Sequence, residues 1–153
     1  MIRLNLSTDY ALRTLLYLAS NPDRQVSTRE IVQFYGISAD HLSKVVQHLV
    51  HGGLVRSGRG RSGGLKLSQP ASEITVGRVV ELFEGPVALL DCISVPGACI
   101  IQPGCRLRNV LQQAGMQLME TLNGVTLEEL VAPPGPSLIK LAPVEPPVKS
   151  GAE

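Results

Sequence analysis

The chain has 153 residues, a formal net charge of +1 and a composition that is 44% hydrophobic but only 3% aromatic, with no Trp. This length suits one domain with an aliphatic core and room for an appended element. No apolar run approaches the roughly 18 residues that cross a bilayer, so no membrane partner is expected. In the first twenty residues Asp9 and Arg13 interrupt the apolar stretch, which argues against a signal peptide. We therefore expect a cytoplasmic protein.

Charge is unevenly distributed along the chain. Residues 1–70 hold nine Lys or Arg against four Asp or Glu, whereas residues 71–153 hold five against nine. A basic first half beside an acidic second half is typical of a nucleic-acid binder that presents one face to phosphate. The imbalance is modest, and it indicates DNA binding only together with the motifs described next.

Three helices are predicted in the first third of the chain. Apolar residues at helical spacing indicate a first helix from about residue 7 to residue 20. The second begins at a capping box, in which Ser27 and Glu30 satisfy each other's backbone N–H groups, and ends at Gly36. Ser38 then caps a longer helix. A short helix, a tight glycine turn and a longer helix are the signature of a helix-turn-helix.

A β-hairpin is predicted directly after these helices. Residues 54–57 and 65–68 alternate apolar and polar side chains, as half-buried strands do, and the segment between them is rich in Gly and Arg. A hairpin in this position makes the unit a winged helix. Residues 1–70 are therefore predicted to form a winged helix-turn-helix DNA-binding domain.

The rest of the chain is predicted to hold a cysteine loop and a dimerisation helix over residues 71–132, followed by a Pro-rich mobile tail over residues 133–153. Helices are expected at about 75–84 and 106–123. One side of the longer helix carries apolar residues at roughly heptad spacing, namely Leu107, Val110, Leu111, Ala114, Leu118 and Leu122. Such a stripe is best buried against a second copy, so we expect a homodimer. The expected fold class is mainly α with a small β-hairpin wing, plus this long helix.

Polar residues on the outer face of the third helix are candidate DNA contacts: Ser38, Asp40, His41, Ser43, Lys44 and Gln47. They can reach base edges in the major groove, and Lys44 can reach phosphate. In the wing, Arg56, Arg59 and Arg61 can lie along the minor groove or its phosphates. An ordinary solvated surface is the alternative, but four like charges near one hairpin, Lys66 included, repel one another and favour a DNA role.

The three cysteines, Cys92, Cys99 and Cys105, lie in one Pro/Gly-rich loop with the spacing C-x6-C-x5-C. Clustered thiols in a reducing compartment indicate metal or redox chemistry. Three thiolates without a fourth suit an iron–sulfur cluster that takes one weaker ligand elsewhere. Zinc, which prefers four ligands, is the second alternative, and a thiol switch is the third, although no C-x-x-C motif is present. A thiol or zinc enzyme ranks below these because no nucleophile–base pair is recognisable.

Asp9 is the candidate for the weaker ligand, and dimerisation can bring it from the partner chain. An oxygen ligand binds a soft cluster weakly, so the iron it holds would be the first to accept a diatomic ligand. Alternatively, Asp9 is a helix N-terminal carboxylate that interacts favourably with the helix dipole. Arg13, one turn on, can pair with Asp9, and Glu84, just before the loop, can lie in the layer around the cluster.

Several of these segments resemble the iron–sulfur winged-helix repressors, over about residues 1–132. The similar segments are Leu6–Arg13, His41–Val46, Arg61–Gly64, and the cysteines with the Arg106-Leu107 that follows them. The resemblance implies a homodimer on a double-stranded DNA operator, with a 4Fe-4S cluster, in preference to 2Fe-2S, on Cys92, Cys99, Cys105 and Asp9 across the dimer.

The signal to which such a repressor responds follows from a detail of the loop. Relatives that regulate iron–sulfur assembly have a histidine ligand shortly after the third cysteine, and this chain reads Arg106-Leu107-Arg108-Asn109 there. The resemblance therefore favours the members that sense nitric oxide, in which reaction of the cluster releases DNA. A sensor of iron supply, cluster supply or redox state with the same fold is the alternative.

Overall fold

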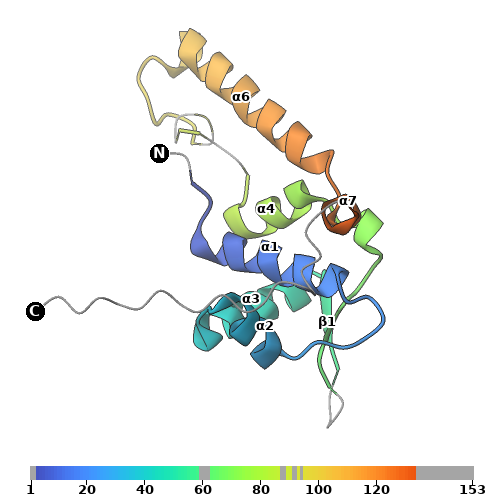
Figure 1. Ribbon diagram of the computed structural model, residues 1–153. Helices are drawn as coiled ribbons and strands as arrows, with labels where there is room; N and C mark the ends of the chain where they lie inside the picture. The colour runs from blue at the N-terminus through green and yellow to red at the C-terminus, as the bar shows by residue number, and fades with distance from the viewer. Residues whose placement is uncertain (1–2, 59–62, 87–88, 91–92, 94, 134–153) are drawn as a thin grey trace, which may run out of the picture.

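A computed structural model describes residues 3–58, 63–86, 89–90, 93 and 95–133 (Figure 1). Arg59, Arg61, Cys92 and residues 134–153 lie outside this part, so the predictions made for them stay predictions. In chain order the elements are α1 (Leu6–Ala19), α2 (Thr28–Tyr35), α3 (Ala39–His51), β1 (Val55–Ser57), β2 (Leu65–Leu67), η1 (Ala71–Glu73), α4 (Val76–Glu84), η2 (Gln102–Gly104), α6 (Arg106–Asn123) and α7 (Leu127–Val131).

The helix-turn-helix forms as the sequence predicts. Gly36 ends α2 in the left-handed conformation, with φ 62° and ψ 37°, which a residue with a side chain adopts only at a cost. Ser38 caps α3 by accepting a hydrogen bond from the backbone N–H of His41 at 3.3 Å. The first helix begins slightly earlier than expected because Asn5 accepts from the N–H of Thr8 at 2.8 Å and serves as its cap.

The capping box predicted at the start of α2 is only half formed. Ser27 Oγ accepts from the backbone N–H of Glu30 at 3.2 Å. The Glu30 carboxylate forms its hydrogen bonds with Arg24, from the loop after α1, and with Tyr17 of α1, while the Ser27 backbone still contributes to lowering its pKa. Of the two predicted bonds, the one from the Glu30 N–H to Ser27 Oγ is thus confirmed, and the Glu30 carboxylate is shared with other donors.

The core is built around α1, which lies between α4 on one side and α2 with α3 on the other (Figure 1). Ala11 and Leu15 of α1, Leu42 and Leu49 of α3, and Val79 of α4 have no exposed surface. Aliphatic side chains thus supply most of the core, as the scarcity of aromatic residues predicts. Burying one such Leu contributes about 1.5–3 kcal/mol.

The wing is a two-stranded antiparallel hairpin that places Val55 opposite Leu67 and Arg56 opposite Lys66. Val55 and Leu65 are buried against the core formed by helices α1 to α4, which we call the head, whereas Arg56 is exposed. The mainly helical chain with one small hairpin beside the helix-turn-helix confirms the predicted fold class.

The long helix α6 has the predicted bounds and extends away from the head in Figure 1. Its C-terminal end is attached to the head where Gly77 of α4 contacts Asn123. A Cβ at position 77 would lie 2.1 Å from Asn123 Oδ1, so this approach requires glycine. Beyond it, the N–H of Leu127 donates to the carbonyl of Ile74 at 2.9 Å. No helix within the described ranges combines the length and apolarity that a bilayer span requires.

A charged network joins the loop after α1 to α2. Glu30 Oε1 accepts from the Tyr17 hydroxyl at 2.8 Å, and Glu30 Oε2 accepts from Arg24 Nη1 at 3.0 Å. The Arg24 guanidinium holds the pKa of Glu30 below its ordinary value of 4.5. Burial and the Glu30 carboxylate raise the pKa of Tyr17 above 10.0.

Glu30→Gln tests this network. Because the folded-state pKa of Glu30 is depressed, its stabilisation is fully present above pH 4.5 and is lost as the pH falls through the folded value. We expect the variant to lower the free energy of unfolding by less than about 1 kcal/mol at neutral pH, since both partners are partly solvated. Urea titrations at several pH values measure this, and a difference that does not shrink in acid would contradict it.

Candidate nucleic-acid interface and cysteine loop

The outer face of α3 is polar and open to solvent. Leu42, Val45 and Leu49 hold the opposite face in the core. Five of the six predicted DNA contacts on this helix are exposed: Ser38, Asp40, Ser43, Lys44 and Gln47. In Figure 1, α2 and most of α3 lie on the far side of α1 from α6, and the C-terminal end of α3 reaches α4, where the His48 ring packs on that of Phe83. The arrangement leaves α3, the second or recognition helix of the helix-turn-helix, accessible to a large ligand.

His41, the sixth, is turned toward α1. Its Nε2 lies 3.0 Å from Ser7 Oγ, and its ring packs on that of Tyr10 with 5.1 Å between the centroids. Helical spacing predicts His41 on the outer face, but the start of α3 packs against α1, and the His41 side chain turns toward Ser7 and Tyr10. His41 thereby connects the recognition helix to the first turns of α1.

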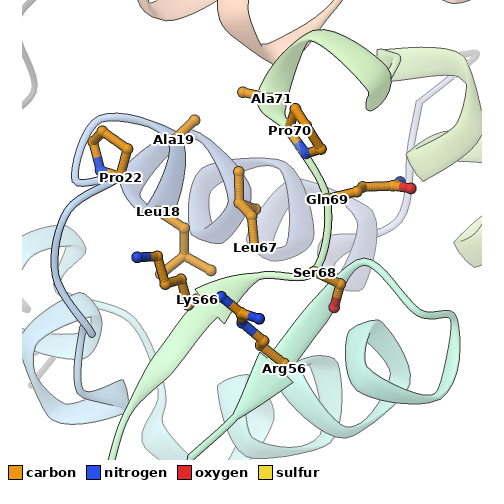
Figure 2. A pocket seen from close by; sticks show the side chains of 10 residues that line it. All are labelled: Leu18, Ala19, Pro22, Arg56, Lys66, Leu67, Ser68, Gln69, Pro70 and Ala71. Carbon is orange, nitrogen blue, oxygen red and sulfur yellow. The ribbon is translucent and has the colours of Figure 1, made fainter.

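The root of the wing carries two cations. Arg56 and Lys66 are directly opposite in the hairpin, and the side chain of neither forms an ion pair or hydrogen bond with the residues that the structure describes. Like charges in this register are destabilising without an anion nearby. They border a shallow pocket of about 320 Å³ whose apolar wall includes Leu18 and Leu67 (Figure 2). The cations are thus free to meet phosphate.

Two of the three cysteines can be placed. Cys99 and Cys105 are half-buried free thiols in the loop between α4 and α6. Cys105 is the residue before α6, and its side chain does not cap that helix. The backbone N–H of Gln102 donates to the Cys99 carbonyl at 3.1 Å, and the N–H of Cys105 donates to the Gln102 carbonyl at 3.5 Å. One short turn therefore holds both cysteines.

The predicted pair of Asp9 and Arg13 is present. Arg13 Nε donates to Asp9 Oδ1 at 2.9 Å, and both side chains are slightly more than 40% exposed. The Arg13 guanidinium also lies 5.8 Å from the centre of the Tyr35 ring, whose pKa burial raises to about 12. Asp9 borders an open pocket of about 560 Å³ at the start of α1, together with the exposed Leu4 and Leu6.

Glu84 connects the end of α4 to the start of α1. Its Oε1 accepts from the backbone N–H of Asn5 at 2.8 Å and from the Thr8 hydroxyl. Glu84 thus lies where the cysteine loop begins and contacts the helix that carries Asp9. Within the described residues, no three His, Cys, Asp or Glu side chains gather as a metal site. One chain therefore does not bring Asp9 and Glu84 together with Cys99 and Cys105.

The apolar stripe of α6 is largely uncovered in the single chain. Leu107 and Val110 are 59% and 61% exposed. Ala114 and Leu118 are also exposed, whereas the other two members of the predicted stripe, Leu111 and Leu122, are half-buried. A contiguous apolar surface of this kind marks an interaction site.

A winged helix-turn-helix with an open polar recognition face defines a class, the DNA-binding transcription regulators. The family model Rrf2, described as an iron-dependent transcriptional regulator, matches residues 4–133. The chain belongs to the Rrf2 family of transcription regulators.

Solved structures agree with this assignment. The chain is similar to CymR of B. subtilis, titled the global cysteine regulator, with 27% identity over 85% of this chain and 96% of that chain and a TM-score of 0.71. CymR of Staphylococcus aureus shares 28% identity over 82% and 95%, with a TM-score of 0.65. IscR of T. potens, at 23% identity over 85% and 86% and a TM-score of 0.69, shares the fold.

Proposed function

We propose that this chain is a homodimeric transcriptional repressor whose operator binding is controlled by a nitric-oxide-sensitive iron–sulfur cluster, as in the repressor NsrR. The observation that carries the proposal is the pair of free thiols, Cys99 and Cys105, held by one turn directly before the long helix. Thiolates are the ligands that iron–sulfur clusters prefer. The cluster, 4Fe-4S in preference to 2Fe-2S, would be held by these two cysteines and Cys92, with Asp9 supplied across the dimer.

The surroundings of the loop suit an anionic group of this kind. Cys105 stands at the N-terminus of α6, where the first backbone N–H groups and the helix dipole favour negative charge. Asp9 is partly exposed, so a second chain can reach it. When bound, the cluster supplies an iron that reacts with nitric oxide. Asp9 would hold that iron through a carboxylate oxygen, a weaker ligand for a soft cluster than a thiolate.

The route from the loop to DNA runs through contacts of the head. Glu84 joins the loop's first residues to α1, and His41 joins α1 to the recognition helix. A change in head geometry that alters the free energy of operator binding by about 2–3 kcal/mol would alter operator affinity about 30–100-fold. The chain's own packing can therefore convert the state of the loop into a difference in DNA affinity.

On DNA, two recognition helices about 34 Å apart would read a near-palindromic double-stranded operator. Ser38, Asp40, Ser43 and Gln47 are offered to base edges, and Lys44 to phosphate. On the wing, Arg56, Arg59 and Arg61 are offered to the minor groove or its phosphates. We assign His41 to the contact between α1 and α3.

A second candidate function is a sensor of iron or cluster supply. The description of the family as iron-dependent favours it. The absence of a histidine among the four residues after Cys105 favours nitric oxide. Titration of the reconstituted protein with nitric oxide and, separately, with an iron chelator distinguishes the two, because the true signal releases DNA at the lower dose.

Cys99→Ala tests cluster control. We expect the anaerobically reconstituted variant to hold little iron and sulfide and to bind the operator at least about 30-fold more weakly, while remaining a dimer. Visible absorption, iron and sulfide assays and a gel-shift titration measure this. Ala98→Ser, a neighbouring exposed position, serves as the control. Operator binding by Cys99→Ala as tight as that of the wild type would contradict cluster control.

Lys44→Ala tests the recognition helix. Removing one phosphate contact should weaken binding to all sequences alike and reduce the slope of log affinity against log salt by about 1. Arg78→Ala removes an exposed cation from α4, beside the C-terminal end of α3 and off its outer polar face, and should leave the slope unchanged. Equal slopes for wild type and Lys44→Ala would remove Lys44 from the interface.

Val110→Glu tests the dimer helix. A charge buried in an apolar interface without a partner should weaken dimerisation about 100-fold or more. Gln112→Glu places the same charge on another side of α6 and should leave the dimer intact. Sedimentation equilibrium measures both, and an unchanged dimer in Val110→Glu would show that copies associate elsewhere.

A further inference from the structure

We propose that the side-chain amide of Gln102 is a positioning group that holds the cysteine loop in the shape that receives the cluster. The inference rests on the proposed function, because it assigns a role toward the same site. It concerns a residue that cannot itself be expected to ligate iron and that the sequence pattern does not distinguish from the other glutamines.

Both the oxygen and the nitrogen of the Gln102 side-chain amide form hydrogen bonds with the backbone of the cysteine loop. The backbone N–H of Gly97 donates to Gln102 Oε1 at 2.6 Å, and Gln102 Nε2 donates to the Val95 carbonyl at 3.1 Å. Gly97 has φ +78°, a conformation suited to glycine, in the turn that offers these two backbone groups. One acceptor and one donor are needed here, and a side-chain amide supplies both.

The backbone of the same residue contacts both cysteines that the structure describes. Gln102 donates to the carbonyl of Cys99 and accepts from the N–H of Cys105. The side chain therefore fixes the segment before Cys99, while the main chain fixes the segment from Cys99 to Cys105. Through these bonds Gln102 sets the position of one cysteine relative to the other.

Apolar packing does not explain the shape of this loop. Its large apolar residues point outward: Ile100 is 98% exposed, and Val95 and Ile101 are more than half exposed. Hydrogen bonds are the forces that remain to order the segment. A further hydrogen bond, from Arg108 Nη2 to the Ile93 carbonyl at 3.4 Å, fixes the residue that follows Cys92.

A loop ordered in advance retains a cluster longer. Ligands that are already held in place lose less conformational entropy when the cluster binds. Without the amide, the segment from Val95 to Cys99 gains freedom each time a thiolate leaves iron, and rebinding slows. The side chain of Gln102 is therefore expected to affect retention of the cluster more than the stability of the fold.

The test compares Gln102→Leu with Gln112→Leu, the same change at an exposed position of α6. After anaerobic reconstitution, we expect Gln102→Leu to lose iron to a chelator roughly tenfold faster than the wild type, since two hydrogen bonds are removed. Gln112→Leu should match the wild type. Gln102→Glu, which can accept from Gly97 but cannot donate to Val95, should be intermediate.

A readout independent of iron completes the experiment. In the metal-free protein, the Gly97 amide should exchange its hydrogen faster in Gln102→Leu, while helix content and dimer mass stay the same. Unchanged iron loss in Gln102→Leu would overturn the positioning role even if the cluster is present. If the wild type binds no cluster, the proposed function itself fails, and the role of Gln102 toward the cluster fails with it.

Discussion

The burial of α1 between α4 and α3 is the constraint on which the rest of the structure depends. Ala11 and Leu15 have no exposed surface, so α1 cannot shift without disturbing both neighbours. Its first turns make the polar contacts to Glu84 on one side and to His41 on the other. The single helix α1 thus contacts both the C-terminal end of α4, where the cysteine loop begins, and α3, the helix proposed to bind DNA.

The polar contacts divide into two kinds, and the division matters for function. Arg24, Glu30 and Tyr17 join two parts of the head that are already held by apolar packing. Glu84 and Gln102 instead order segments with little apolar support: the exposed first residues of the chain and the loop. Hydrogen bonds decide the conformation where burial does not, and the loop is also the segment that would hold the proposed cluster.

Local signals in the sequence were sufficient for most of the fold. Gly36 and Ser38 define the turn of the helix-turn-helix, and the apolar period of α6 gives its bounds. Contacts between distant residues were not predictable in this way. Nothing near Glu30 indicates that Arg24 competes with its capping role, and the period of α3 does not reveal that Ser7 and Tyr10 draw His41 inward. The exposure of five of the six polar residues proposed on α3 was foreseen because it follows from helical spacing alone. Gln102 was missed because a glutamine in a loop carries no pattern.

The close approach of Gly77 to Asn123 has a mechanical consequence. It fastens α6 at one end, while Cys105 stands at the other, eighteen helical residues away. At 1.5 Å per residue that distance is about 27 Å, so a tilt of about 5° at the fastened end displaces the far end by about 2 Å. Gly77, which has only a hydrogen atom in place of a side chain, is therefore the pivot for any tilt of α6. A larger side chain at position 77 would move this pivot.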